Sequence, residues 1–241
     1  MVVKKLKTGI SGLDKVFKGG VREKSALLIS GGPGTGKSIF AMHFLIAGAK
    51  AGEPGMAILY DVDKDEYLDY ADTLGLPVRK YVDEKKIFLV KQPLLLRKTP
   101  NLSVPLELMR KRKIKRVVLD SLTMFSYVHV TDDRQYRSEI VNFLDRMNGV
   151  TLLATSEARF LNIDEANFNP EDFLFDGVVY LTKVRKEAEF ERVLHVSKMR
   201  GQDHLINLVP FFIDKGGIKV YPDQIPFAVV GWEPPTTGFA K

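Results

Sequence analysis

The chain has 241 residues, of which 45% are hydrophobic and 27% are charged, and it contains no cysteine. These fractions are typical of a globular protein with a full core, and they exclude wholesale disorder and fibrous repeats. The lack of cysteine excludes a disulfide scaffold, a cysteine-ligated zinc site and thiol catalysis. The four histidines show no metal-binding spacing.

No apolar run reaches the length of about 18 residues that a membrane-spanning helix needs. The longest candidate, Ile39 to Gly52, is interrupted by His43 and Lys50. The basic start of the chain leads directly into Thr8-Gly9, without the apolar segment of a signal peptide. We therefore expect a cytoplasmic protein that has no membrane partner.

The net charge of +6 is concentrated in one short segment. Residues Arg110 to Arg116 carry six positive charges, which equals the whole excess. Such a run can bind phosphate backbones, but it more often forms a solvated helix end. Because Val117 to Leu119 follow it, we favour a solvated helix end that leads into a buried strand.

Apolar segments of strand length alternate with segments of helical period, which predicts a mostly parallel sheet flanked by helices. The predicted strands are, in chain order, Ala26–Ser30, Met56–Tyr60, Ile87–Val90, Val117–Leu119 and Val150–Ala154. Four helices are predicted. The first begins near Lys37, the second ends at about Leu74-Gly75, the third contains the basic run, and the fourth extends over Asp132–Asn148.

The last third of the chain predicts antiparallel hairpins, which would extend the parallel sheet into a mixed one. Their strands are expected at Val178–Leu181 with Val193–Val196, and at Phe211–Ile213 with Ile218–Tyr221. We expect one domain over residues 1–222 and a C-terminal tail over 223–241, which contains the only tryptophan, Trp232.

The segment after the first predicted strand reads Gly31-Gly32-Pro33-Gly34-Thr35-Gly36-Lys37-Ser38, and it fits the P-loop pattern G-x-x-x-x-G-K-[ST]. Glycines are needed because backbone N–H groups must surround phosphate oxygens, and side chains would obstruct that approach. Lys37 would reach the β- and γ-phosphates, and the Ser38 hydroxyl would bind Mg²⁺. A strand precedes the loop and a helix follows it, so Gly31 to Ile39 predict a nucleoside triphosphate site.

A metal-binding carboxylate is expected at the end of a buried strand next to the P-loop strand. Asp120 ends the predicted strand Val117–Leu119, and it would hold Mg²⁺ directly or through water. Many strands end in aspartate because of turn geometry, so Asp120 indicates a metal site only in combination with the P-loop.

Seven segments in the same order resemble KaiC-like ATPases of the RecA superfamily. They are Thr8–Asp14, Gly19-Gly20, Ala49–Gly55, Leu119–Ser121, Ala154–Glu157, Lys198–Gly201 and Pro210–Val220. The resemblance covers about Thr8 to Pro222. It implies an α/β fold with a RecA-like P-loop core, ATP and Mg²⁺ as ligands, nucleotide at subunit interfaces, and a homo-oligomer that is commonly hexameric.

Two basic residues match the family's K-x-R pair, which reaches the γ-phosphate of the neighbouring subunit's nucleotide. These are Lys198 and Arg200, which would share one face of a strand and act as an arginine finger does. The resemblance also implies that His204 and Asp214 line the nucleotide from the neighbouring side. Without the resemblance, two basic residues on an edge strand would indicate only protection against aggregation.

The chain departs from the family where two adjacent glutamates usually end the second strand and activate the attacking water. Asp61 occupies the first of these positions and Val62 the second. Because a misplacement near 1 Å can lower a rate about a hundredfold, we expect firm ATP binding and slow hydrolysis.

RecA relatives bind DNA through loops after the fourth and fifth strands. The loop 156–176 carries six acidic residues against Arg159 alone, a net charge of −5, which disfavours phosphate contacts. The basic run 110–116 stays an alternative DNA contact, although it lacks interleaved aromatic residues. The aromatic residues of this loop indicate either a part of the core or a surface that docks another protein. They are Phe160, Phe168, Phe173 and Phe175.

Two functions follow from the sequence. The first is a slow ATPase whose oligomeric state or binding to an unknown protein partner depends on nucleotide. The second is a recombination or repair ATPase whose salt-sensitive DNA binding requires residues 110–116. Autophosphorylation of the clock type is disfavoured, because no convincing target segment follows the K-x-R pair.

Overall fold

The structure is a computed structural model that describes residues 4–93, 102–123, 125, 133–158 and 169–226. Its centre is a nine-stranded sheet with the order β11-β10-β9-β8-β3-β7-β6-β4-β5. The strands from β8 to β5 are mutually parallel, and β9, β10 and β11 add antiparallel pairings at one edge. The predicted mixed α/β sheet is confirmed.

All five predicted parallel strands and both hairpins are present. The strands are β3 (Ala26–Gly31), β4 (Gly55–Leu59), β5 (Ile87–Lys91), β6 (Arg116–Asp120), β7 (Thr151–Glu157), β8 (Gly177–Lys186), β9 (Glu189–Met199), β10 (Val209–Asp214) and β11 (Gly217–Val220). The sequence pattern did not indicate the pair β1 (Lys5–Leu6) and β2 (Val21–Arg22), because two residues are too few to show an alternation.

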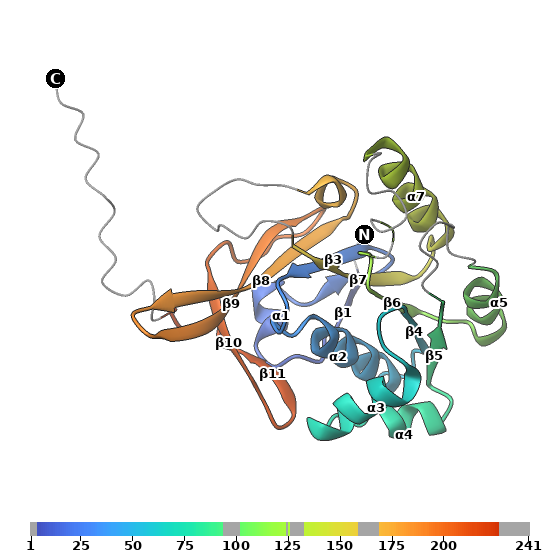
Figure 1. Cartoon of the computed structure of the whole chain (residues 1–241), viewed down its shortest axis with the longest axis horizontal. Coiled ribbons are helices and arrows are strands. Elements are labelled where there is room, and N and C mark those ends of the chain that lie inside the picture. The colour runs from blue at the N-terminus through green and yellow to red at the C-terminus, as the bar shows by residue number, and fades with distance from the viewer. Residues whose placement is uncertain (1–3, 94–101, 124, 126–132, 159–168, 227–241) are drawn as a thin grey trace.

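Helices cover both faces of the sheet (Figure 1). They are α1 (Leu13–Val16), α2 (Lys37–Lys50), α3 (Lys64–Thr73), α4 (Val78–Asp83), α5 (Ser103–Arg112), α7 (Asp133–Arg146) and the 3-10 helix η1 (Pro170–Phe173). The apolar residues of α2, α3 and α4 pack on one face with Leu27 of β3, and those of α5 and α7 pack on the other face with Leu28. Successive strand residues point to opposite faces, so both faces of these buried strands are apolar. Among the described residues, no helix combines the length and apolarity that crossing a bilayer requires.

Arg116, the last residue of the basic run, lies in the core rather than in solvent. Its side chain is 1% exposed and its guanidinium lies 4.8 Å from the centre of the Phe44 ring. Two of its nitrogens donate to one carboxylate oxygen of Glu53 at 2.8 Å each, and the third donates to the carbonyls of Lys7 and Phe44 at 2.8 and 3.0 Å. The expectation of a solvated run is therefore wrong at Arg116 and right for Arg110 to Lys115, where every basic side chain is exposed.

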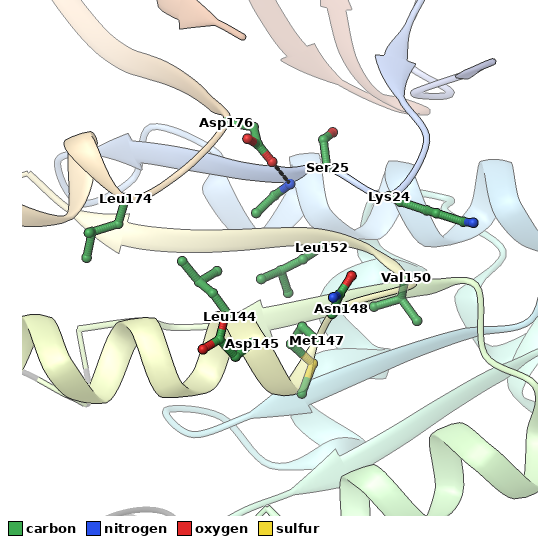
Figure 2. A pocket seen from close by; sticks show the side chains of 11 residues that line it. Lys24, Ser25, Leu144, Asp145, Met147, Asn148, Val150, Leu152, Leu174 and Asp176 are labelled. Carbon is green, nitrogen blue, oxygen red and sulfur yellow. Dashed lines mark hydrogen bonds between the residues drawn. The ribbon is translucent and has the colours of Figure 1, made fainter. Parts of the chain in front are cut away.

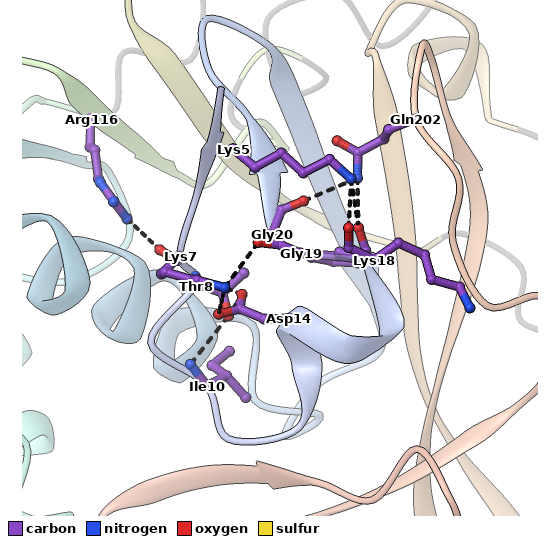
Figure 3. A network of polar contacts seen from close by, with 11 residues as sticks. Lys5, Lys7, Thr8, Ile10, Asp14, Lys18, Gly19, Gly20, Arg116 and Gln202 are labelled. Atoms are coloured by element: carbon purple, nitrogen blue, oxygen red, sulfur yellow. Dashed lines mark hydrogen bonds and ion pairs between the residues drawn. The ribbon is translucent and has the colours of Figure 1, made fainter. Parts of the chain in front are cut away.

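Polar contacts also hold the segments on both sides of α1 (Figure 3). Asp14 accepts hydrogen bonds from the backbone N–H and the hydroxyl of Thr8, at 3.0 and 2.9 Å. The Gln202 side chain donates to the carbonyls of Phe17 and Gly20 at 3.1 and 3.0 Å. Beyond the predicted domain end, Asp223 is ion-paired with Lys15 at 2.6 Å, and the boundary at residue 222 stays a prediction.

His43 joins three segments by its two ring nitrogens. Its Nδ1 lies 3.2 Å from the carbonyl of Gly9, and its Nε2 accepts the backbone N–H of Ile218 at 3.0 Å. This arrangement requires a neutral ring with the proton on Nδ1. Burial lowers the pKa of His43 to about 4, against an opposing contribution from the Gly9 carbonyl.

Replacing Arg116 by Met should lower the free energy of unfolding by about 3 kcal/mol, because Glu53 and two buried carbonyls lose their donor. Urea denaturation measures this, with Lys115→Met as the control. Lys115 is exposed, so its loss should change stability by at most about 0.5 kcal/mol. Equal stability of the two variants would contradict the structural role of Arg116.

Acidification should destabilise the protein through His43. The pKa is lower in the folded than in the unfolded state, so the stability contribution is full above pH 6.5 and is lost as the pH falls toward 4. Between pH 7 and pH 5 we expect a loss of about 2 kcal/mol. Denaturation at both pH values should show this loss of stability in the wild type. In His43→Gln, stability should fall less between pH 7 and pH 5, because the contribution of the histidine ring is absent. An unchanged pH dependence in the variant would show that the ring does not titrate as inferred.

Candidate nucleotide-binding site

The P-loop follows β3 at the carboxyl edge of the parallel strands and leads into α2. Gly34 and Gly36 have φ angles of +67° and +104°, which residues other than glycine rarely adopt. A methyl group at Gly31 would lie 2.5 Å from the Leu181 carbonyl oxygen and 2.8 Å from Thr35 Oγ1. The loop is thus packed against β8, and Gly31, Gly34 and Gly36 are required by conformation or by space.

Lys37 lies among the carboxylates at the ends of neighbouring strands. Its Nζ donates to the carbonyls of Gly31 and Gly32 at 2.9 and 3.0 Å. Burial lowers the pKa of Lys37, and the negative charges of Glu157, Asp120 and Asp61 oppose this, in that order of size. A cation in a cradle of carbonyls and backbone N–H groups, next to several carboxylates, is suited to a phosphate chain with its metal ion.

Asp120 is buried at the end of β6, as predicted, and contacts Ser38 of the P-loop. The prediction that its strand is next to the P-loop strand is wrong, because β7 lies between β3 and β6. Asp120 accepts hydrogen bonds from the hydroxyls of Thr155 and Ser38. Burial raises the pKa of Asp120, and the two hydroxyls act in the opposite direction. Hard oxygen donors of this kind fit Mg²⁺, which usually binds one or two protein oxygens, the nucleotide's phosphates and water. Ser38 and Asp120 would hold the ion.

Asp61 follows β4 and lies on the Asp120 side of the site. Its Oδ2 accepts the hydroxyl of Ser121 at 2.9 Å, and its charge raises the pKa of Asp120. The next residue, Val62, faces the core, and its carbonyl accepts Lys91 Nζ at 3.0 Å. One exposed carboxylate therefore stands where the family usually has two.

Lys198 and Arg200 lie at the other end of the sheet from the P-loop of their own chain. Lys198 pairs with Val178, which pairs with Leu28 near the start of β3. Arg200 lies in the turn after β9, where its N–H donates to the Asp176 carbonyl at 2.7 Å and its guanidinium to that of Phe173 at 2.9 Å. Because β9 ends at Met199, Arg200 lies one residue beyond the strand, and the convergence of both cations on one anion stays a prediction.

His204 and Asp214 lie in different elements. Asp214 ends β10, and the preceding Ile213 side chain lies 2.8 Å from a methyl group built at Gly36. Ile213 thus packs against the P-loop of its own chain. His204 lies in the loop between β9 and β10, where the next residue donates its N–H to the Val16 carbonyl at 2.9 Å. The nucleotide contacts of both residues stay predictions.

Three residues near the site were not predicted from the sequence. Thr155 and Glu157 occupy alternate positions at the end of β7, within the segment 154–157 that carries the family resemblance. Lys183 of β8 places its Nζ 3.6 Å from a methyl group built at Gly34. The strand alternation could have indicated the first two, whereas nothing local indicates Lys183.

Two acidic residues in the described part of the loop after β7 are buried. Glu171 and Asp172 are 3% and 5% exposed. Ser156 donates to Glu171 at 3.2 Å, the Tyr180 hydroxyl donates to Asp172, and burial raises the pKa of both carboxyls. The net charge of −5 therefore overstates the surface charge of the loop. Phe175 is buried and Phe173 exposed, whereas Phe160 and Phe168 lie outside the described residues.

A pocket of about 190 Å³ lies between the start of β3 and the end of α7 (Figure 2). Leu144, Met147 and Leu152 form part of its apolar lining, and Asp176 at its edge accepts the Ala26 N–H at 3.0 Å. The pocket is at the opposite end of β3 from the P-loop, so it is separate from the nucleotide site.

The family model described as "ATPase: KaiC" matches residues 6–225. The chain belongs to the KaiC ATPase family. A UPF0273 protein of Pyrococcus furiosus is 31% identical, over 93% of this chain and 96% of that protein. The circadian clock oscillator protein KaiC of Parasynechococcus marenigrum is 33% identical, and this chain spans 46% of its length. The crystal structure of a KaiC-like protein from Pyrococcus horikoshii matches with a TM-score of 0.78 and 30% identity, over 92% of this chain and all of that one.

Proposed function

We propose that this KaiC-family protein binds ATP with Mg²⁺ and hydrolyses it slowly, and that the nucleotide lies between copies of the chain. The observation that carries the proposal is the placement of two complementary half-sites. The P-loop, Ser38, Asp61 and Asp120 meet at the carboxyl edge of the parallel strands. The K-x-R pair lies at the opposite edge of the same sheet, which supports a contact with the nucleotide of a second copy.

Each half of such a site has a separate task. The P-loop N–H groups and Lys37 bind the phosphates, and Ser38 and Asp120 hold the metal ion. Bound Mg²⁺ would supply charge neutralisation at the β- and γ-phosphates. Lys198 and Arg200 of a neighbouring copy would add positive charge at the γ-phosphate, which is present in ATP and absent from ADP. Assembly would therefore depend on which nucleotide is bound.

This dependence makes the protein a nucleotide-gated oligomeric regulator or scaffold, with a hexameric ring as the expected assembly and an unidentified protein as partner. Action on DNA is the weaker alternative. The basic run it needs includes the buried Arg116, so neutralising residues 110–116 together would disturb the core. A test of DNA binding should change only the exposed side chains from Arg110 to Lys115.

ATP, but not ADP, should increase the particle mass measured by light scattering. Lys198→Ala with Arg200→Ala should abolish this increase and leave ATP binding to single chains intact, whereas Lys37→Ala should abolish binding itself. Lys111→Ala with Arg112→Ala removes the same charge from an exposed helix end and should assemble normally. Assembly that is independent of nucleotide would contradict the proposed switch.

Asp61→Ala should lower ATP turnover at least tenfold without weakening ATP binding, because the carboxylate helps to orient water beside the metal ion. Steady-state phosphate release and binding of a fluorescent ATP analogue separate the two quantities. Turnover as fast as in relatives with two glutamates, or an unchanged rate in the variant, would show that Asp61 has no such role.

A further inference from the structure

Glu157 lies beside the P-loop because of the pairing between β3 and β7. The register places Glu157 directly opposite Gly31, whose carbonyl accepts Lys37 Nζ. The backbone on both sides of the Glu157 Cα is held: its own N–H donates to Thr123 Oγ1 at 3.0 Å, and the N–H of Ala158 donates to the Gly31 carbonyl at 3.3 Å. The position of this residue is therefore set by the sheet and not by a free loop.

Strand alternation determines the face on which the Glu157 side chain lies. Ser156 donates to the buried Glu171 on one face, and Thr155 donates to Asp120 on the other. Glu157 shares the face of Thr155 because it is two residues further along the strand. This is the face that carries the P-loop and the metal-binding carboxylate.

The charge of Glu157 acts on the nucleotide site. Among the three carboxylates that stabilise the charged form of Lys37, Glu157 has the largest effect, ahead of Asp120 and Asp61. Asp120 is buried between two hydroxyls, and Asp61 is held by Ser121 on the metal side. Glu157 is exposed, so its carboxylate can meet a water molecule on the Lys37 side.

We propose that Glu157 accepts the proton of the attacking water, a role that no sequence motif assigned to it. The inference rests on the proposed ATPase function. The water oxygen forms a bond to the γ-phosphorus, and the bond from that phosphorus to the β–γ bridging oxygen breaks. The electron pair of the broken bond stays with ADP, one water proton passes to the Glu157 carboxylate, and it is later released to solvent. Asp61 then orients the water from the metal side.

The test compares three variants with the wild type under single-turnover conditions with Mg²⁺ and excess enzyme. Glu157→Gln should lower the hydrolysis rate about a hundredfold, the range of a lost general base. Its ATP affinity should be unchanged or tighter, because a negative charge near the γ-phosphate is removed. Asp61→Asn should lower the rate about tenfold. Glu189→Gln, an exposed glutamate at the turn between β8 and β9, should behave as the wild type does.

Glu157→Asp separates chemistry from structure. It keeps a carboxylate and should retain part of the rate that Glu157→Gln loses, whereas a purely structural role would make the two variants equal. Hydrolysis by Glu157→Gln within threefold of the wild type would overturn the inference. A wild type that fails to bind ATP, or that binds ATP and does not hydrolyse it, would instead overturn the proposed function.

Discussion

The buried guanidinium of Arg116 is the contact on which the arrangement of this protein depends. It joins the N-terminal segment at Lys7, helix α2 at Phe44 and the segment before β4 at Glu53. A buried ion pair adds little stability over an apolar replacement, but the loss of one partner is costly. Its effect here is to fix which segments meet at the start of β6. The other end of that strand carries Asp120, so the same strand that is anchored in the core presents the metal-binding carboxylate.

The parallel sheet gathers charged groups at its carboxyl edge, because every parallel strand ends there. Asp61, Asp120 and Glu157 end or follow β4, β6 and β7, and they surround Lys37 at the start of α2. Concentrating like charges in this way is costly unless cations enter. In the proposed function, a metal ion would supply a compensating cation, and the ammonium of Lys37 would bind the phosphates. The antiparallel strand β9 runs the other way and carries Lys198 toward the opposite edge, with Arg200 in the turn that follows.

The sequence predicted local features well and distant contacts poorly. The P-loop, the five parallel strands and the two hairpins were all predicted, because glycine spacing and apolar periodicity are properties of short segments. The expectation for Arg116 failed because a charged residue in a linear pattern is assigned to solvent, whereas its partners Lys7, Phe44 and Glu53 lie far along the chain. The orientation of Arg200 stays a prediction, since strand alternation applies only as far as the strand extends.

By itself the sequence determined which groups the candidate site offers: a glycine-rich loop that fits the P-loop pattern, a hydroxyl and a carboxylate suited to a metal ion, and a second carboxylate where the resemblance implies two glutamates. Tertiary structure decided which of these groups meet. The pairing of β3 with β7 brings Glu157 to Gly31 across more than a hundred residues, and the direction of β9 places Lys198 away from its own P-loop. Strand order and register are set by the packing of both faces of the sheet, a long-range condition that no short segment encodes.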